Sequence, residues 1–282
     1  MAEGRQPFTL PALIKVTRFW NLVIIALAQV LTAYCLVGYF TVLSWQLYVL
    51  AISTTLIAAA GYIINDYYDV KIDLINKPER VVVGKSMRRR YALFFHWMLS
   101  ILGVTLGFLL NWEILAINIF SGFLLWWYSN FLKRKPFVGN FSIALLTGLP
   151  VYQVAVLFDP LNKMIIAYSF FSFFVTLIRE IIKDMEDWRG DNTFGCQTLP
   201  ILWGIRKTKV FIYALIVFNV AAIIYFNNLY LGFEVRVLAF FIFIPILLLI
   251  LRLVKADTVK DFYYLSFYCK VILVAGIFSM LL

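Results

Sequence analysis

Long uncharged runs of apolar residues alternate along the chain with short, strongly charged segments. The first run, 19–65, contains no charged residue and is long enough for two membrane-spanning helices, with a break near 38–44. A spanning helix needs about 20 mostly apolar residues, because each residue advances the helix by about 1.5 Å. Further apolar runs follow at 91–112, 114–132, 136–158, 164–178, 210–233, 237–251 and 262–282, the last interrupted by Lys270. The pattern predicts an all-α, polytopic membrane protein with nine transmembrane helices.

The composition excludes a water-soluble globule. Of the 282 residues, 63% are hydrophobic and 14% are charged, and the mean hydropathy is +0.89. An ordinary soluble domain is about half apolar and about a quarter charged. A chain of this length cannot hide so many apolar side chains in one core, so the surrounding solvent is predicted to be a lipid bilayer.

The lysine and arginine residues gather at alternate ends of the predicted helices. With nine helices, 21 of the 25 fall in the N-terminal tail and in the second, fourth, sixth and eighth connections. Cytoplasmic loops of membrane proteins collect positive charge, so these segments are predicted to face the cytoplasm from a plasma or inner membrane, with the C-terminus outside. The net charge of +10 then reflects topology and contact with anionic membrane lipid, and no nucleic-acid partner is predicted.

Most of the acidic residues lie in two short windows at the predicted cytoplasmic ends of helices. Nine of the 15 are in these windows: Asp66, Asp69, Asp73, Glu79, Glu180, Asp184, Glu186, Asp187 and Asp191. The aspartates of the first window fall within an arc of about 60° if the preceding helix continues through them. Asp184, Asp187 and Asp191 have the same spacing, with Glu180 one turn earlier. The sequence therefore predicts two acidic stripes.

Two stripes of like charge repel each other unless they share a cation. Hard oxygen ligands without nearby His or Cys favour Mg²⁺, which is usually held by one or two carboxylates, waters and the phosphates of a substrate. A phosphate ester is therefore the predicted substrate, and basic residues on the same side could bind its remaining charge: Arg80, Lys133, Arg134 and Lys183. The alternative interpretation, solvated helix ends with ordinary surface charge, fits one such stripe better than two of identical spacing.

Both windows resemble the aspartate-rich motifs of the UbiA superfamily of intramembrane prenyltransferases. The first motif reads Asn65-Asp66-x-x-Asp69-x-x-x-Asp73, followed by Asn76-x-Pro78-x-Arg80 and Gly84. The second reads Arg179-Glu180-Ile181-Ile182-Lys183-Asp184-Met185-Glu186-Asp187, then Gly190-Asp191 and Gln197-Thr198-Leu199-Pro200. With the helix count, the resemblance covers essentially the whole chain. It implies a single prenyltransferase domain over 1–282, with the helices bundled around a central lipid-accessible cavity.

The resemblance also implies roles for the matching residues. The Mg²⁺ ligands would be Asp66, Asp69, Asp184 and Asp187. Asp73 and Asp191 would complete the catalytic carboxylates, and either could take the proton of the acceptor. The substrate-binding residues would be Asn21, Asn65, Arg80, Tyr128, Lys133 and Lys183. The chain departs from the family at 81–85, where it reads Val-Val-Val-Gly-Lys and many members have a proline-containing loop.

The second motif most resembles family members that prenylate a glycerol phosphate ether lipid. This resemblance implies Mg²⁺-dependent transfer of a polyprenyl group, in this subfamily geranylgeranyl, from prenyl diphosphate to a hydroxyl of a prenylglyceryl phosphate. An aromatic acid of quinone biosynthesis is the alternative acceptor. A CDP-alcohol phosphotransferase would show an Asp-Gly and an Ala-Arg pair that this motif lacks. A transporter would place charged residues near the membrane midplane rather than at one face.

Overall fold

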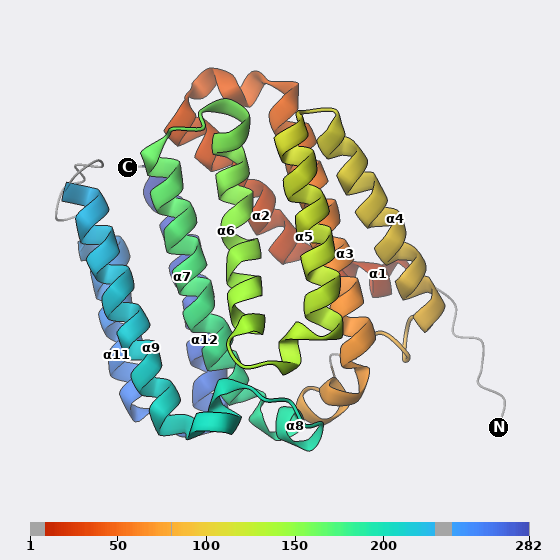
Figure 1. Cartoon of the computed structure of the whole chain (residues 1–282), viewed down its shortest axis with the longest axis vertical. Helices are drawn as coiled ribbons and strands as arrows, with labels where there is room; N and C mark the ends of the chain where they lie inside the picture. Colours follow the sequence, from red (N-terminus) through yellow and green to blue (C-terminus); the bar gives the residue numbers. More distant parts are fainter. Residues whose placement is uncertain (1–8, 80, 229–238, 282) are drawn as a thin grey trace. The chain divides into compact units, whose positions relative to one another are not determined.

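The protein is built from α-helices throughout the part of the chain that the structure describes. The computed structural model describes residues 9–79, 81–228 and 239–281 (Figure 1). The chain forms two compact units. Unit 1 comprises Met1–Val30 and Ser44–Leu132, and unit 2 comprises Leu31–Leu43 and Lys133–Leu282. The boundary between them crosses the second helix, so each unit is described by itself.

The helices of unit 1 are α1 (Leu10–Val16), most of α2 (Phe19–Thr32), α3 (Trp45–Asn76), α4 (Arg89–Phe108) and α5 (Trp112–Asn130). Those of unit 2 are α6 (Val138–Phe158), α7 (Lys163–Glu186), α8 (Trp188–Thr193), α9 (Leu199–Phe226), α11 (Ile244–Lys255) and α12 (Val259–Phe278). Short π-helical or 3₁₀ turns lie at Ala33–Val37, Tyr39–Leu43, Leu132–Arg134, Ala239–Phe243 and Ser279–Leu281.

Seven helical segments in the described ranges are long and apolar enough to cross a bilayer. They are Phe19–Val37, Trp45–Asn76, Arg89–Phe108, Val138–Phe158, Lys163–Glu186, Leu199–Phe226 and Val259–Leu281. The other two predicted spans correspond to α5 and to α11, which is 12 residues long and follows the undescribed stretch 229–238. The prediction of an all-α, multi-pass membrane protein is confirmed, whereas the count of nine stays a prediction.

Helix α3 is the element that extends the first acidic motif beyond the bilayer. Its 32 residues correspond to about 48 Å of helix, against roughly 30 Å of hydrocarbon. The charge-free part, 45–65, is by itself long enough to cross. The three aspartates that follow therefore lie in the turns that continue past the apolar region, and the predicted helical continuity through them is confirmed.

Close helix contacts hold unit 1 together, with α4 and α5 packed against α3 (Figure 1). The Asn118 Nδ2 of α5 donates to the Ser53 Oγ of α3 at 2.7 Å, and that hydroxyl donates to the backbone oxygen of Gly103 in α4 at 2.7 Å. Interhelical hydrogen bonds and small residues are the usual means of helix association in lipid, where hydrophobic burial contributes little. A polar link and a glycine contact therefore fix the position of α3.

We expect Gly103→Ala to destabilise the protein by about 1–3 kcal/mol. A Cβ at this position would lie 2.6 Å from the Ile57 Cγ1 and 3.0 Å from the backbone oxygen of Ser53, so α4 must move away from α3. The melting temperature of the detergent-solubilised protein measures the effect. Gly122→Ala is the matched control, because nothing lies within 4 Å of its Cβ position. Equal melting temperatures for the two variants would contradict this account of the α3–α4 contact.

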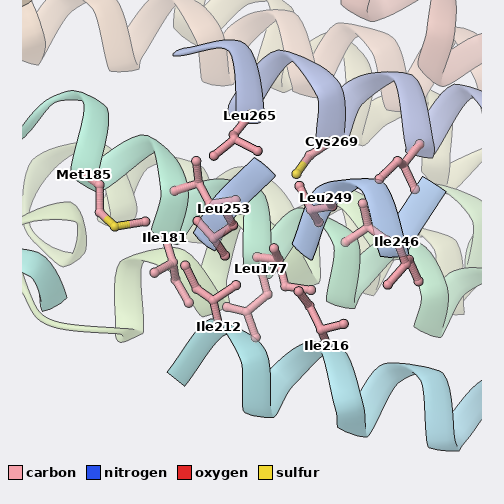
Figure 2. Packing of buried hydrophobic residues seen from close by; sticks show 14 of the residues in the cluster. Leu177, Ile181, Met185, Ile212, Ile216, Ile246, Leu249, Leu253, Leu265 and Cys269 are labelled. Atoms are coloured by element: carbon pink, nitrogen blue, oxygen red, sulfur yellow. The ribbon is translucent and has the colours of Figure 1, made fainter. Parts of the chain in front are cut away.

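Unit 2 is organised around α7, which packs against α6, α9 and α12. Figure 2 shows its buried apolar cluster, to which α7, α9, α11 and α12 all contribute. The labelled side chains are Leu177, Ile181, Met185, Ile212, Ile216, Ile246, Leu249, Leu253, Leu265 and Cys269. Dispersion between these interlocking side chains fixes α7 on several sides. The packing positions the end of α7, where the second acidic motif begins.

Candidate active site

The three aspartates of the first motif lie on one face of α3 near its C-terminal end. Asp66, Asp69 and Asp73 are all partly buried. Asn65 precedes them in the same helix and is also partly buried. The three carboxylates repel one another, and Asp73 also lies in the last turn of α3, where the carbonyl end of the helix carries partial negative charge, so the group is unfavourable unless cations compensate it. This unfavourable charge distribution indicates a site that attracts cations.

Arg18 supplies one such cation to the first motif. Its Nη2 lies 2.9 Å from the Oδ1 of Asp66 and makes both a hydrogen bond and an ion pair. The partial burial of this side chain lowers the pKa of the guanidinium, but the attraction of Asp66 and Tyr62 outweighs this effect and raises the pKa above its ordinary value. Arg18 therefore stays protonated and fixes the side chain of Asp66.

The aromatic ring of Tyr62 and the amide group of Asn21 extend this contact. The guanidinium of Arg18 lies 4.9 Å from the centre of the Tyr62 ring, and the Asn21 Nδ2 donates to the Tyr62 hydroxyl at 3.4 Å. Tyr62 and Asp66 are one turn apart on α3, as Arg18 and Asn21 are around the start of α2. The motif resemblance identified Asn21, Asn65 and Asp66 but missed Arg18 and Tyr62. In the sequence, Arg18 is one more positive charge of the basic N-terminal tail, so no local signal marked it.

The loop that departs from the family pattern is packed against the core of unit 1. Val82, Val83 and Met87 are almost fully buried, and they contact apolar residues of α1, α3 and α4. Gly84 turns the chain with a φ of +86°, and its N–H donates to the Met87 oxygen at 2.8 Å. Val82, Val83 and Met87 thus form an apolar anchor for the loop. Arg80, the predicted phosphate-binding residue of this loop, lies outside the described residues.

A second arginine reaches the first motif from the start of α4. The Arg89 guanidinium lies 4.3 Å from the centre of the Tyr67 ring, and its Nη2 donates to the Tyr67 backbone oxygen at 3.4 Å. Tyr67 follows Asp66 directly in α3. Lys85 is fixed by a hydrogen bond from its Nζ to the Pro78 oxygen at 2.7 Å. Arg89 therefore lies next to the acidic face of α3 in the same unit.

The second motif does not form one continuous helical stripe. Helix α7 ends at Glu186, Asp187 forms the junction, and Asp191 lies in the separate short helix α8. The expectation that Asp184, Asp187 and Asp191 share one helix face is therefore wrong. The backbone of Asp187 has φ −88° and ψ 6°, which lies outside helical geometry, so the chain leaves α7 at this residue and α8 starts with a new orientation at Trp188.

Within unit 2, polar neighbours hold the acidic side chains near the end of α7. The Asn140 Nδ2 of α6 donates to the Oδ2 of Asp184 at 2.8 Å. Glu180 is buried and pairs with Arg179, while the Lys183 Nζ lies 3.8 Å from the Glu180 Oε2. Glu180 thus serves an ion-pair cluster within α7. Asn140, which the motif reasoning missed, could be noticed only as a polar residue in the first turn of an apolar helix.

The other predicted substrate residues lie on different units. Tyr128 is a partly buried residue of α5 in unit 1, and Lys133 lies in the Leu132–Arg134 turn at the start of unit 2. The backbone oxygen of Arg134 accepts a hydrogen bond from the Gln197 N–H at 2.9 Å, which joins this turn to the end of the second motif. Lys133 is thereby placed on the same unit as Asp184 and Lys183.

The described residues contain no group of three or more His, Cys, Asp or Glu side chains that could together hold one metal ion. Mg²⁺ does not need such a cage, because it usually takes one or two carboxylates and completes its shell with waters and phosphates. Each unit supplies carboxylates at the end of a membrane helix and cationic side chains beside them. Each of these helix ends, taken by itself, suits a charged phosphate ester whose apolar part lies in the membrane.

These features define a multi-pass helical membrane protein with two aspartate-rich helix ends. The model of the UbiA prenyltransferase family matches residues 22–269. The chain belongs to this family.

Its relatives include archaeal enzymes of one named activity. The digeranylgeranylglyceryl phosphate synthase of Saccharolobus solfataricus is 34% identical over 239 residues, which are 82% of each protein. The enzyme of the same name from Sulfurisphaera tokodaii is 32% identical over 231 residues, covering 78% of this chain and 81% of the relative. The resemblance seen in the second motif thus extends over most of the sequence.

Solved structures of family members share the fold. That of a digeranylgeranylglyceryl phosphate synthase in membranes matches with a TM-score of 0.74 and 25% identity, over 96% of each chain. A UbiA homologue from Archaeoglobus fulgidus, solved bound to GPP and Mg²⁺, matches with a TM-score of 0.70 and 15% identity, over 96% of this chain and all of that one.

Proposed function

We propose that this protein transfers a geranylgeranyl group from its diphosphate to a hydroxyl of a prenylglyceryl phosphate, in a Mg²⁺-dependent reaction. The observation that carries the proposal is the acidic face of α3, which continues directly from a membrane-crossing segment. A diphosphate bound at this end can leave its prenyl tail in the bilayer. The relatives named above as digeranylgeranylglyceryl phosphate synthases support this donor and acceptor.

The donor chemistry of the acidic windows fits Mg²⁺. The side chains are carboxylates and amides, and Asp66 already accepts a cationic partner in Arg18. When bound, Mg²⁺ would neutralise the leaving diphosphate and so favour cleavage of the allylic C–O bond. We assign Asp66 and Asp69 of α3, with Asp184 and Asp187 at the end of α7, as its ligands. The homologue from Archaeoglobus fulgidus, which was solved bound to GPP and Mg²⁺, supports Mg²⁺ as the metal.

The remaining polar residues serve binding and proton transfer. Lys133 and Lys183 with Arg80 bind diphosphate oxygens, and Tyr128 contributes to the same binding. Asn21 and Asn65 line the pocket. Asp73 or Asp191 takes the proton of the acceptor hydroxyl as the new ether bond forms, because each is a carboxylate close to the proposed metal ligands in sequence. No covalent bond to the protein is needed.

Two alternatives are less well supported. An aromatic acceptor would keep the metal site, but the relatives reported above are named digeranylgeranylglyceryl phosphate synthases. A transporter would place its charges at the midplane of broken helices. Here, the aspartates of both motifs lie in the C-terminal third of α3 or at and after the C-terminal end of α7.

The topology completes the proposal. We propose nine transmembrane helices in one domain over 1–282, with the N-terminus and active site cytoplasmic. The positive connections support this orientation. The helical character of α5 and α11 supports the two spans beyond the seven that length and composition identify. The family model, which matches a single stretch over most of the chain, supports one domain.

We expect the purified protein to prenylate geranylgeranylglyceryl phosphate and to leave 4-hydroxybenzoate unchanged. Labelled geranylgeranyl diphosphate and both acceptors, mixed with protein in lipid vesicles, measure the preference by chromatography of the products. Efficient prenylation of the aromatic acid without turnover of the glyceryl phosphate would show that the proposed acceptor is wrong. The assignment of the protein as a prenyltransferase would still hold.

The acceptor phosphate needs its own cation, and the cluster Lys85, Arg88, Arg89 and Arg90 or the pair Arg206 and Lys207 could supply it. The position of Arg89 on Tyr67 favours the first cluster. Arg89→Gln should raise the KM for the acceptor about tenfold with little change in the KM for the diphosphate. Arg206→Gln is the matched control, and a larger effect there would move the acceptor site to the second pair.

A further inference from the structure

The position of Arg18 has a consequence for how the first motif receives its metal. Thr17 and Arg18 connect α1 to α2, and the φ of Arg18, +53°, is left-handed. A residue with a Cβ rarely adopts this conformation, and it persists only where the surroundings fix it. Here, the backbone turn directs the chain from α1 into α2 while the guanidinium of the same residue contacts Asp66.

The contacts of Arg18 are specific to the first carboxylate of the motif. Its Nη2 is 2.9 Å from the Asp66 Oδ1, and its guanidinium lies over the ring of Tyr62, one turn earlier on α3. The Tyr62 hydroxyl accepts a hydrogen bond from the Asn21 Nδ2. Arg18 and Asn21 therefore both contact the same face of α3. A carboxylate oxygen that accepts from a guanidinium has less negative charge to offer to another cation.

We propose that Arg18 is a positioning residue whose ion pair with Asp66 competes with the metal for the same carboxylate, so that the pair must open before Asp66 can ligate the metal. This inference rests on the proposed function, since it takes Asp66 as a metal ligand. The positive charge of Arg18 reduces the repulsion among the aspartates of α3. It also weakens binding of metal alone, so tight metal binding requires the additional ligands that a diphosphate brings.

Binding of Mn²⁺ to the full chain in detergent, without diphosphate, tests the proposal. Mn²⁺ is a spectroscopic substitute for Mg²⁺, and electron paramagnetic resonance of the free ion gives the dissociation constant. Arg18→Asn removes the guanidinium, and Asn tolerates the left-handed backbone. We expect this variant to bind Mn²⁺ about three- to fivefold more tightly than the wild type, the range expected for loss of one partly exposed ion pair.

Two further variants separate the pair from simple charge. Lys15→Asn removes one positive charge from α1, where Lys15 contacts the Glu79 oxygen and not Asp66, and should leave the constant within about twofold of wild type. Arg18→Lys keeps a positive charge at this position, so it should bind Mn²⁺ more weakly than Arg18→Asn does. An unchanged or weaker affinity in Arg18→Asn, or equal gains in Arg18→Asn and Lys15→Asn, would overturn the proposal.

Asp66→Asn identifies the site that is being measured. If the wild type binds Mn²⁺ and Asp66→Asn does not, Asp66 is a metal ligand. The Arg18 variants then test the role of Arg18 separately. If Asp66→Asn binds Mn²⁺ as well as the wild type does, the assignment of Asp66 as a ligand fails and the role of Arg18 fails with it. A separate reading comes from thermal unfolding: Mn²⁺ should raise the melting temperature of Arg18→Asn more than that of the wild type.

Discussion

Replacing any one of Asp66, Asp69, Asp184 and Asp187 by Asn should lower prenyl transfer by roughly a thousandfold or more, because each change removes charge that the bound cation needs. The amide keeps the size of the side chain, so the protein should still fold into the membrane. Turnover of labelled geranylgeranyl diphosphate at saturating Mg²⁺ measures the loss. Size-exclusion chromatography in detergent shows that each variant is intact.

Asp159 provides the control for this first prediction. Asp159→Asn makes the same chemical change at the end of α6, outside both acidic windows, and should keep near wild-type activity. Full activity in two of the four variants would defeat the model in which both windows share the metal. Loss in Asp66 and Asp69 variants alone would confine the metal to α3.

Removal of divalent metal should abolish turnover, and added Mg²⁺ should restore it. Without metal, the acidic windows face an anionic diphosphate directly, and the repulsion should weaken diphosphate binding by about tenfold or more. Chelation with EDTA followed by Mg²⁺ add-back measures turnover. Equilibrium binding of labelled prenyl diphosphate to protein in detergent measures affinity.

The control for this second prediction is potassium chloride at the ionic strength of the Mg²⁺ solution, which should not restore activity. Equal diphosphate binding with and without chelator would contradict the role of metal in binding. In that case, Lys133, Lys183 and Arg80 would hold the diphosphate alone, and Lys183→Gln should then lower affinity strongly.

Hydropathy and motif spacing predicted much of the molecule because both depend on residues close together in the sequence. A run such as 45–65 forms a membrane helix wherever it is placed, since lipid leaves its backbone groups no partners except each other. The run continues without a helix breaker into Asn65 and the three aspartates, so their common face follows from helical geometry. The spacing of the second motif is the same, yet its helix ends at Glu186. Spacing alone could not reveal that end.

Contacts between distant residues were beyond the sequence pattern. The Arg18–Asp66 pair joins residues 48 positions apart, and the Asn140–Asp184 bond joins residues 44 apart. As a charge in a basic tail, Arg18 is fully explained by topology, so nothing local marks it as a partner of the motif. The valine loop likewise reads as a departure from the family, although burial of Val82 and Val83 gives it a packing role.

Hydrophobicity, helical periodicity and carboxylate ligation are properties of single residues and short segments, so the solvent, the helices and the expected chemistry of this protein follow from its sequence. Contacts formed on folding establish which cation reaches Asp66, which amide holds Asp184 and where the 81–85 loop is anchored. These outcomes depend on how α2, α4 and α6 pack beside α3 and α7 within their units. Packing of that kind arises from shape and hydrogen bonding between segments far apart in the chain, which no local pattern records.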